Sequence, residues 1–72
     1  MIDDAYNAVF EALDILYPNE EGVVNMCRYV GVDDAVGFIY YSEFMRDEEE
    51  MRSTLGKEIA NPIIEHYNLH CK

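Results

Sequence analysis

The sequence has few of the residues on which secreted, membrane-spanning or catalytic proteins depend. Its 72 residues include 2 cysteines, 2 prolines and no tryptophan, and two cysteines are too few for a disulfide scaffold. Its apolar runs are only a few residues long, far short of the roughly 20 residues of a membrane helix. Residues 1–4 lack the basic segment with which a secretion signal begins. We therefore expect a reduced, cytoplasmic protein.

Basic residues are also scarce, because 5 Lys and Arg stand against 15 Asp and Glu, for a formal net charge of −10. Such a chain repels nucleic acid and anionic lipid, so we expect neither direct nucleic-acid binding nor membrane binding. Nucleophiles are few: the hydroxyl residues besides tyrosine are Ser42, Ser53 and Thr54. So short a chain also leaves little room for a cleft that perturbs a pKa. We predict that the protein is not an enzyme and that its partner is basic.

Apolar residues, in contrast, are plentiful. They make up half of the chain, which is enough for the core of a single acidic helical domain over residues 1–72. A chain of this length buries only about 60–65% of its unfolded surface, and oligomerisation is an ordinary way to bury more. Tyr, Phe and Ile exceed what a few short helices easily hide. We therefore expect a homodimer that forms through residues 36–45.

Helix caps, helix stops and apolar spacing predict an all-α protein. The expected fold is a small bundle of four to five short helices at about residues 3–17, 20–30, 34–46, 48–60 and 62–70. The first is the clearest, because Val9 and Leu13 belong to an apolar stripe at helical spacing and Pro18 ends the pattern. Ile15 falls near the polar side of this helix and is a candidate contact residue.

The other helices are predicted mainly from their ends. Asn19, Asp33 and Asp47 are expected to cap helix starts, and Asn61-Pro62 is expected to open the last helix with proline in its first position. Gly56 weakens the helix over 48–60, so a break near Thr54 stays open. The expected core residues of the middle helices are Val23, Val24, Cys27, Val30, Val36, Ile39, Tyr40 and Phe44. A strand over 36–41 is the alternative, but its apolar positions run on without alternating.

The acidic residues gather in three places. Asp3, Asp4, Glu11 and Asp14 fall on the polar side of the first predicted helix, Glu20 and Glu21 begin the second, and Asp47, Glu48, Glu49 and Glu50 begin the fourth. On the first helix, the gaps from Asp4 to Glu11 and from Glu11 to Asp14 are roughly 10 Å and 5 Å along the axis. Such a surface can imitate the phosphates of a nucleic-acid backbone, and Tyr40 and Tyr41 would add aromatic contacts to a partner.

This surface predicts a small acidic, non-enzymatic protein that binds and inhibits a basic, nucleic-acid-binding partner protein by charge mimicry. Small acidic proteins of phages and other mobile elements, of the anti-CRISPR and anti-restriction type, are similar in kind, although no motif here matches one particular family. The alternative is a small regulatory or antitoxin-like helical interaction protein whose charge keeps it soluble.

Two short motifs resemble known sites. The run Gly31-Val32-Asp33-Asp34 resembles the turn of a helix-turn-helix, which implies DNA binding by the following helix, but that helix is acidic where phosphate contacts need Lys and Arg. The segment from Gly37 to Glu43 resembles the second half of an EF-hand loop, but Val32 and Val36 stand where that loop needs oxygen ligands. We expect neither DNA nor calcium to bind.

A third group of residues has side chains that could bind zinc. His66 and His70 lie one helical turn apart with Cys71 beside them, and Cys27 could complete four nitrogen and sulfur ligands. A solvated pair of histidines near a helix C-terminus, where cations are favoured, explains the same residues. We therefore predict no metal and no cofactor, and a metal-binding module is a distant third alternative.

Overall fold

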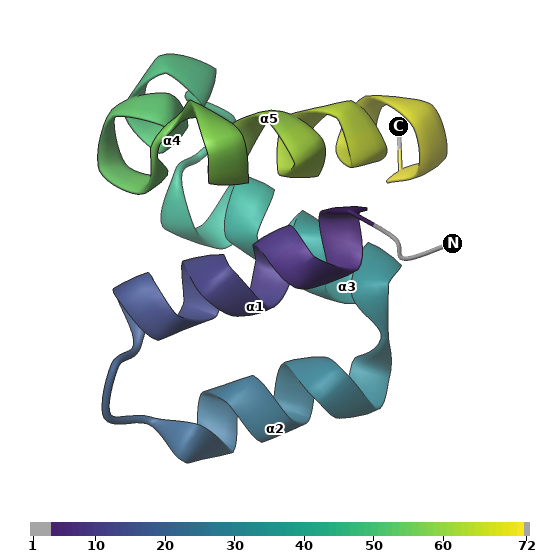
Figure 1. Cartoon of the computed structure of the whole chain (residues 1–72). Coiled ribbons are helices and arrows are strands. Elements are labelled where there is room, and N and C mark those ends of the chain that lie inside the picture. The colour runs from purple at the N-terminus through teal and green to yellow at the C-terminus, as the bar shows by residue number, and fades with distance from the viewer. Residues whose placement is uncertain (1–3, 72) are drawn as a thin grey trace.

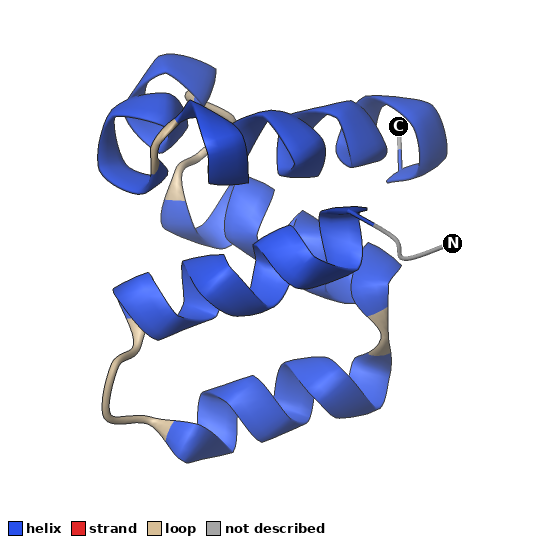
Figure 2. Cartoon of the chain, in the orientation of Figure 1, coloured by secondary structure: helices blue, strands red, loops and turns tan. Residues whose placement is uncertain are grey.

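The structure, a computed structural model, describes residues 4–71, and its regular elements are all helical (Figure 2). They are α1 (Asp4–Leu16), α2 (Glu21–Val30), α3 (Val32–Gly37), the π-helix η1 (Phe38–Glu43), α4 (Glu48–Leu55), α5 (Lys57–His66) and the π-helix η2 (Tyr67–Cys71). The prediction of a small all-α bundle is confirmed. None of the helices within residues 4–71 has both the length and the apolar character needed to cross a bilayer.

Helix α1 is the centre of the arrangement. It packs against α5 and α3, while α4 packs against α5, and α2 lies along the far side of α1 and α3 (Figure 1). The predicted apolar stripe is confirmed, since Val9 and Leu13 are fully buried together with three alanines of α1, whereas Glu11 and Asp14 are exposed. Ile15 is exposed, as expected. The short alanines all fall on this buried side of α1, where they let neighbouring helices approach closely.

The prediction of a third helix over 34–46 is wrong about where the helix begins and ends, and about its type, because part of it is a π-helix. It begins at Val32 and is preceded by Gly31, whose φ of 99° suits glycine, so Asp33 lies in the first turn instead of capping it. From Phe38 it continues as the π-helix η1, and it stops where Met45 and Arg46 adopt positive φ angles of 49° and 67°. A hydrogen bond of 2.8 Å from the Arg46 amide to the Tyr40 carbonyl closes this end.

The buried face of this segment agrees with the prediction. Val36, Ile39, Tyr40 and Phe44 all belong to the core, so the apolar residues that favoured a strand are instead buried on one side of a helix. Much of the segment 36–45 is thus already covered within a single chain. Its exposed large side chains are Phe38, Tyr41 and Met45.

The predicted helices 48–60 and 62–70 are also wrong in their limits. The break that the sequence left open near Thr54 occurs at Gly56, with φ 85° and ψ 153°, and α5 runs from Lys57 to His66 with Pro62 inside it. Pro62 therefore does not open a helix, although it deprives the Glu58 carbonyl of its usual donor. Burial of Ala60 and Ile63 against the core outweighs this local signal. The predicted Asp47 cap is confirmed, since its carboxylate accepts a hydrogen bond of 3.1 Å from the Glu50 amide.

Helix α2 is the least covered helix of the fold. It begins after Glu20, which makes no side-chain cap hydrogen bond, so the predicted Asn19 cap is wrong. Cys27 is its one fully buried residue, and Val30 is exposed where the sequence predicted a core residue. As a result, much of the apolar side of α2 faces a groove at the surface of the protein.

Candidate functional site

The predicted acidic site residues within the described part of the chain lie at α1, at the start of α2 and at the start of α4. Asp4, Glu11 and Asp14 are exposed along α1, Glu20 and Glu21 are exposed at the start of α2, and Asp47, Glu49 and Glu50 are exposed at the start of α4, where Glu48 is half-buried. Asp3 lies outside the described residues. Figure 1 shows α1 between α2 and α4, so these two helices lie on different sides of α1.

The acids at the start of α4 are largely engaged within the protein. Glu48 accepts a hydrogen bond of 2.7 Å from the Tyr40 hydroxyl, and its carboxylate lies 3.7 Å from the Arg52 guanidinium. Glu49 pairs with the same guanidinium at 2.9 Å, and Asp47 caps the helix. These carboxylates therefore stabilise α4 and its junction with η1, which makes them weaker candidates for a partner than the sequence suggested.

The two tyrosines predicted as contact residues have different environments. Tyr40 is only 6% exposed and stacks on Tyr67 with ring centroids 4.1 Å apart. Burial, followed by the hydrogen bond to Glu48, raises the pKa of Tyr40 to about 12. Tyr41 is about half exposed, but its hydroxyl pairs with that of Tyr67 and the Arg46 guanidinium lies over its ring. This aromatic cluster joins η1 to η2 and leaves only Tyr41 accessible to a partner.

The acids near the turn between α1 and α2 are more accessible. Asp14, Glu20 and Glu21 line a hollow of about 440 Å³ together with residues of the turn and Arg28. Arg28 itself lies 5.2 Å from the centre of the Phe10 ring. Three exposed carboxylates thus stand around one concave surface, which favours a cation or a basic side chain there.

Beside that turn, the Tyr17 hydroxyl donates a hydrogen bond to the half-buried Glu43. Burial and then the Glu43 carboxylate raise the pKa of Tyr17 to about 12. This contact connects the end of α1 to η1.

A groove between α2, α3 and η1 is the main feature that the sequence did not reveal. It has a volume of about 670 Å³, and most of its lining is apolar: Gly22, Val23, Met26, Cys27, Val30, Ala35 and Phe38, with Glu20 and Asp34 at its rim. Met26 is 65% exposed within it. Glu20 also lines the acidic hollow, so the groove and the acids of the α1–α2 turn form one continuous surface.

The sequence contained a signal for this groove. Val23, Met26 and Val30 recur at i, i+3 and i+7 on α2, in addition to the valine at position 24 and the buried Cys27. A helix of ten residues with apolar side chains over so wide an arc has more apolar surface than one packing partner covers. Exposed apolar surface rimmed by charge is typical of protein interaction sites.

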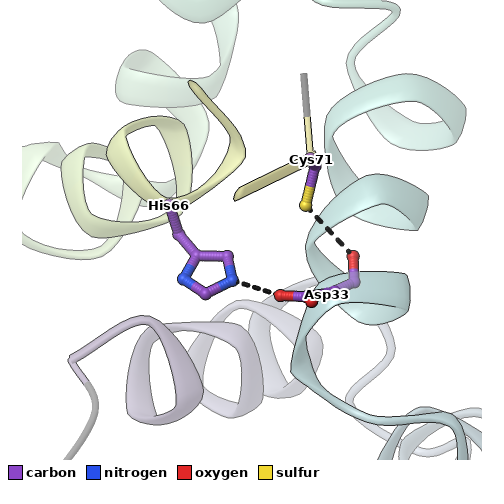
Figure 3. A group of neighbouring side chains, drawn as sticks. All are labelled: Asp33, His66 and Cys71. Atoms are coloured by element: carbon purple, nitrogen blue, oxygen red, sulfur yellow. Dashed lines mark hydrogen bonds and ion pairs between the residues drawn. The ribbon is translucent and has the colours of Figure 1, made fainter. Parts of the chain in front are cut away.

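The histidines at the C-terminal end are not the solvated pair that the sequence predicted. The His66 side chain is only 10% exposed, and its Nε2 lies 2.5 Å from the Asp33 Oδ1 atom of α3 (Figure 3). His70 remains exposed and packs against the His66 ring with centroids 4.5 Å apart. The Cys71 thiol donates to the Asp33 carbonyl oxygen at 3.6 Å, so Asp33 contacts the end of α5 and the end of η2.

This cluster lacks the features of an activated cysteine. The Cys71 thiol hydrogen-bonds to a carbonyl oxygen instead of the His66 ring. Burial and the neighbouring Asp33 and Asp34 raise the pKa of Cys71, whereas a nucleophilic cysteine needs a lowered one. Burial likewise raises the pKa of Cys27, which is a free thiol in the core.

The chain matches no known protein family, no curated protein and no solved structure at a significant level. The geometry of the described residues is therefore the basis for assigning a function.

Proposed function

We propose that this protein is a small acidic, non-enzymatic binding protein whose groove between α2, α3 and η1 holds a basic, amphipathic helical segment of a partner protein. The observation that carries this proposal is the continuity of an exposed apolar groove with carboxylates at its rim. Apolar side chains of the partner would pack on Met26 and Phe38, and its Lys or Arg residues would face Glu20 and Asp34. Such helix-in-groove binding is a common mode of peptide recognition.

Charge decides between the possible occupants of the groove. A second copy of this chain, the homodimer expected from the sequence, would bring together two molecules with a formal charge of −10 each. Nucleic acid is repelled for the same reason. A basic partner is attracted instead, and the attraction accelerates its association. Where the basic segment is also the partner's nucleic-acid-binding surface, the acidic protein blocks it, and this is the inhibitory function that we favour.

The proposal is tested with a synthetic peptide that has Leu and Lys at helical spacing, together with a Leu and Glu peptide of the same pattern. We expect the basic peptide to bind and the acidic peptide not to bind. Met26→Ser should weaken binding of the basic peptide about tenfold, which corresponds to roughly 1.4 kcal/mol. Met45→Ser is the matched control, because Met45 is 82% exposed and is not among the residues that line the groove.

A second pair of variants tests the charges. Glu20→Gln with Glu21→Gln should slow association and reduce its dependence on salt, because exposed charges are screened beyond about 8 Å at physiological ionic strength. Glu50→Gln with Glu58→Gln removes two other exposed carboxylates, which are not among the residues that line the groove, and should have a smaller effect. Equal effects of both pairs, or of both methionine variants, would refute the assignment of the groove. Sedimentation shows whether a second copy occupies it instead.

A further inference from the structure

Asp33, His66 and Cys71 bring three different donor atoms together from two distant parts of the chain. The carboxylate oxygen, the imidazole nitrogen and the thiol sulfur all lie within 4.8 Å of one another. Within residues 4–71, this is the one group of at least three His, Cys, Asp or Glu donors that is so closely spaced. The sequence-based set of zinc ligands contained Cys27 and His70 and omitted Asp33, so the structure assembles a different group.

The π-helix η2 is what places Cys71 beside His66. In an α-helix, residues five apart point about 140° away from each other, since each residue adds about 100°. A π-helix pairs residues i and i+5, and this wider turn brings His66 and Cys71 toward the same side. Asp33, in the first turn of α3, then faces both side chains across the junction of α3 with α5 and η2 (Figure 3).

From this geometry we propose that Asp33, His66 and Cys71 form a binding site for a divalent transition metal, with zinc as the preferred ion. Nitrogen and sulfur donors select zinc and similar ions over magnesium and calcium, which prefer oxygen alone. Three protein ligands leave the fourth position of a tetrahedral ion to water. This site is independent of the groove and does not rest on the proposed function.

The three donor atoms need only small side-chain movements to reach the spacing that a zinc ion requires. A tetrahedral zinc ion with bonds of about 2.0–2.3 Å holds its donor atoms roughly 3.3–3.7 Å apart. The present spacing between His66 Nε2 and Asp33 Oδ1 is 2.5 Å, so this pair must open slightly. The Cys71 thiol releases its proton to solvent when it binds the ion, because only the thiolate is a metal ligand. His66 is held by its surroundings, whereas the Asp33 side chain is 63% exposed and free to adjust. The metal would then join α3 to η2, as metal ions do in other small domains.

Cobalt is the probe for the ligands, because a thiolate bound to Co²⁺ gives a charge-transfer absorption band. The reduced protein should show this band when it is titrated with Co²⁺, and Zn²⁺ should abolish it. Cys71→Ser should remove the band, whereas Cys27→Ala should keep it. Zn²⁺ should also raise the melting temperature of the wild type by several degrees, because a ligand that binds the folded state stabilises it.

Comparison of two neighbouring aspartates, Asp33 and Asp34, distinguishes a metal ligand from a charge that only attracts cations. Asp33→Asn should weaken zinc binding at least about tenfold, since even outer-shell partners of a metal ligand are worth about 10–100-fold. Asp34→Asn removes an equal exposed charge one residue away that acts on Cys71 only electrostatically, so it should weaken zinc binding much less than Asp33→Asn. Absence of the thiolate band in the wild type would overturn the proposal, and so would equal losses in the two aspartate variants.

Discussion

The break at Gly56 can be tested by the sign of a stability change. Replacing Gly56 with alanine should destabilise the observed fold, but it would stabilise a continuous helix over residues 48–60. Gly56 has φ 85° and ψ 153°, a region that is open almost only to glycine and costs other residues about 1–3 kcal/mol. An added Cβ would meet no atom within 4 Å, so packing does not contribute to this cost. Gly56→Ala should therefore lower the free energy of unfolding by about 1–3 kcal/mol.

Gly37 is the matched control within the same chain. An added Cβ also finds nothing within 4 Å there, but Gly37 has helical angles of φ −60° and ψ −43°. Gly37→Ala should raise the free energy of unfolding by about 0.5–1 kcal/mol, because alanine loses less backbone entropy in a helix. The two variants should thus differ by at least about 1.5 kcal/mol, and each kcal/mol shifts the melting temperature by about 4–8 °C in a domain of this size.

Urea denaturation followed by circular dichroism measures both values, and thermal melts provide a second measure. If Gly56 lay inside a continuous helix over residues 48–60, as its sequence context suggests, Gly56→Ala would stabilise the protein as Gly37→Ala does. A stabilising effect of Gly56→Ala would therefore refute the break between α4 and α5. It would also refute the position of α5, which carries His66.

Two further predictions concern stability. Pro62→Ala should raise the free energy of unfolding by about 2 kcal/mol, because it restores a hydrogen bond inside α5. This gain outweighs the loss of the rigidity that proline gives to the unfolded chain. A loss of stability in urea denaturation would instead place Pro62 at a helix start. Tyr40 is protonated up to about pH 12 in the folded protein but only to about pH 10 when unfolded, so its contribution is complete below pH 10 and is lost between about pH 10 and 12. Tyr40→Phe should therefore make stability fall less steeply over that range, as urea denaturation at a series of pH values would measure.

Features that depend on neighbours in the sequence were predicted well. The amphipathic helix α1 follows from apolar residues at helical spacing, and the Asp47 cap follows from a side chain that reaches an amide three residues later. The burial of Val36, Ile39 and Tyr40 was predicted for the same reason, because residues three or four apart share one side of a helix. These interactions span a single turn, so the residues within that turn determine them.

Other features depended on which helices pack together. Asn61-Pro62 is a good helix start by local rules, but burial of Ile63 and its neighbours against α1 extends the helix through the proline. The groove exists because α1 and α3 cover only part of α2. The wide apolar arc of α2 signals surplus apolar surface, but not which part of it stays open.

The cluster of Asp33, His66 and Cys71 is the clearest example of a feature that local sequence patterns do not predict. It joins residues 33 positions apart, and the turn that aligns His66 with Cys71 is a π-helix instead of the α-helix expected locally. The sequence by itself determined that the protein is acidic and helical and which side of most helices is apolar, since these properties arise from composition and from contacts within one turn. Only the tertiary structure decided where the apolar surface stays open and which donor atoms meet, because both depend on packing between distant segments.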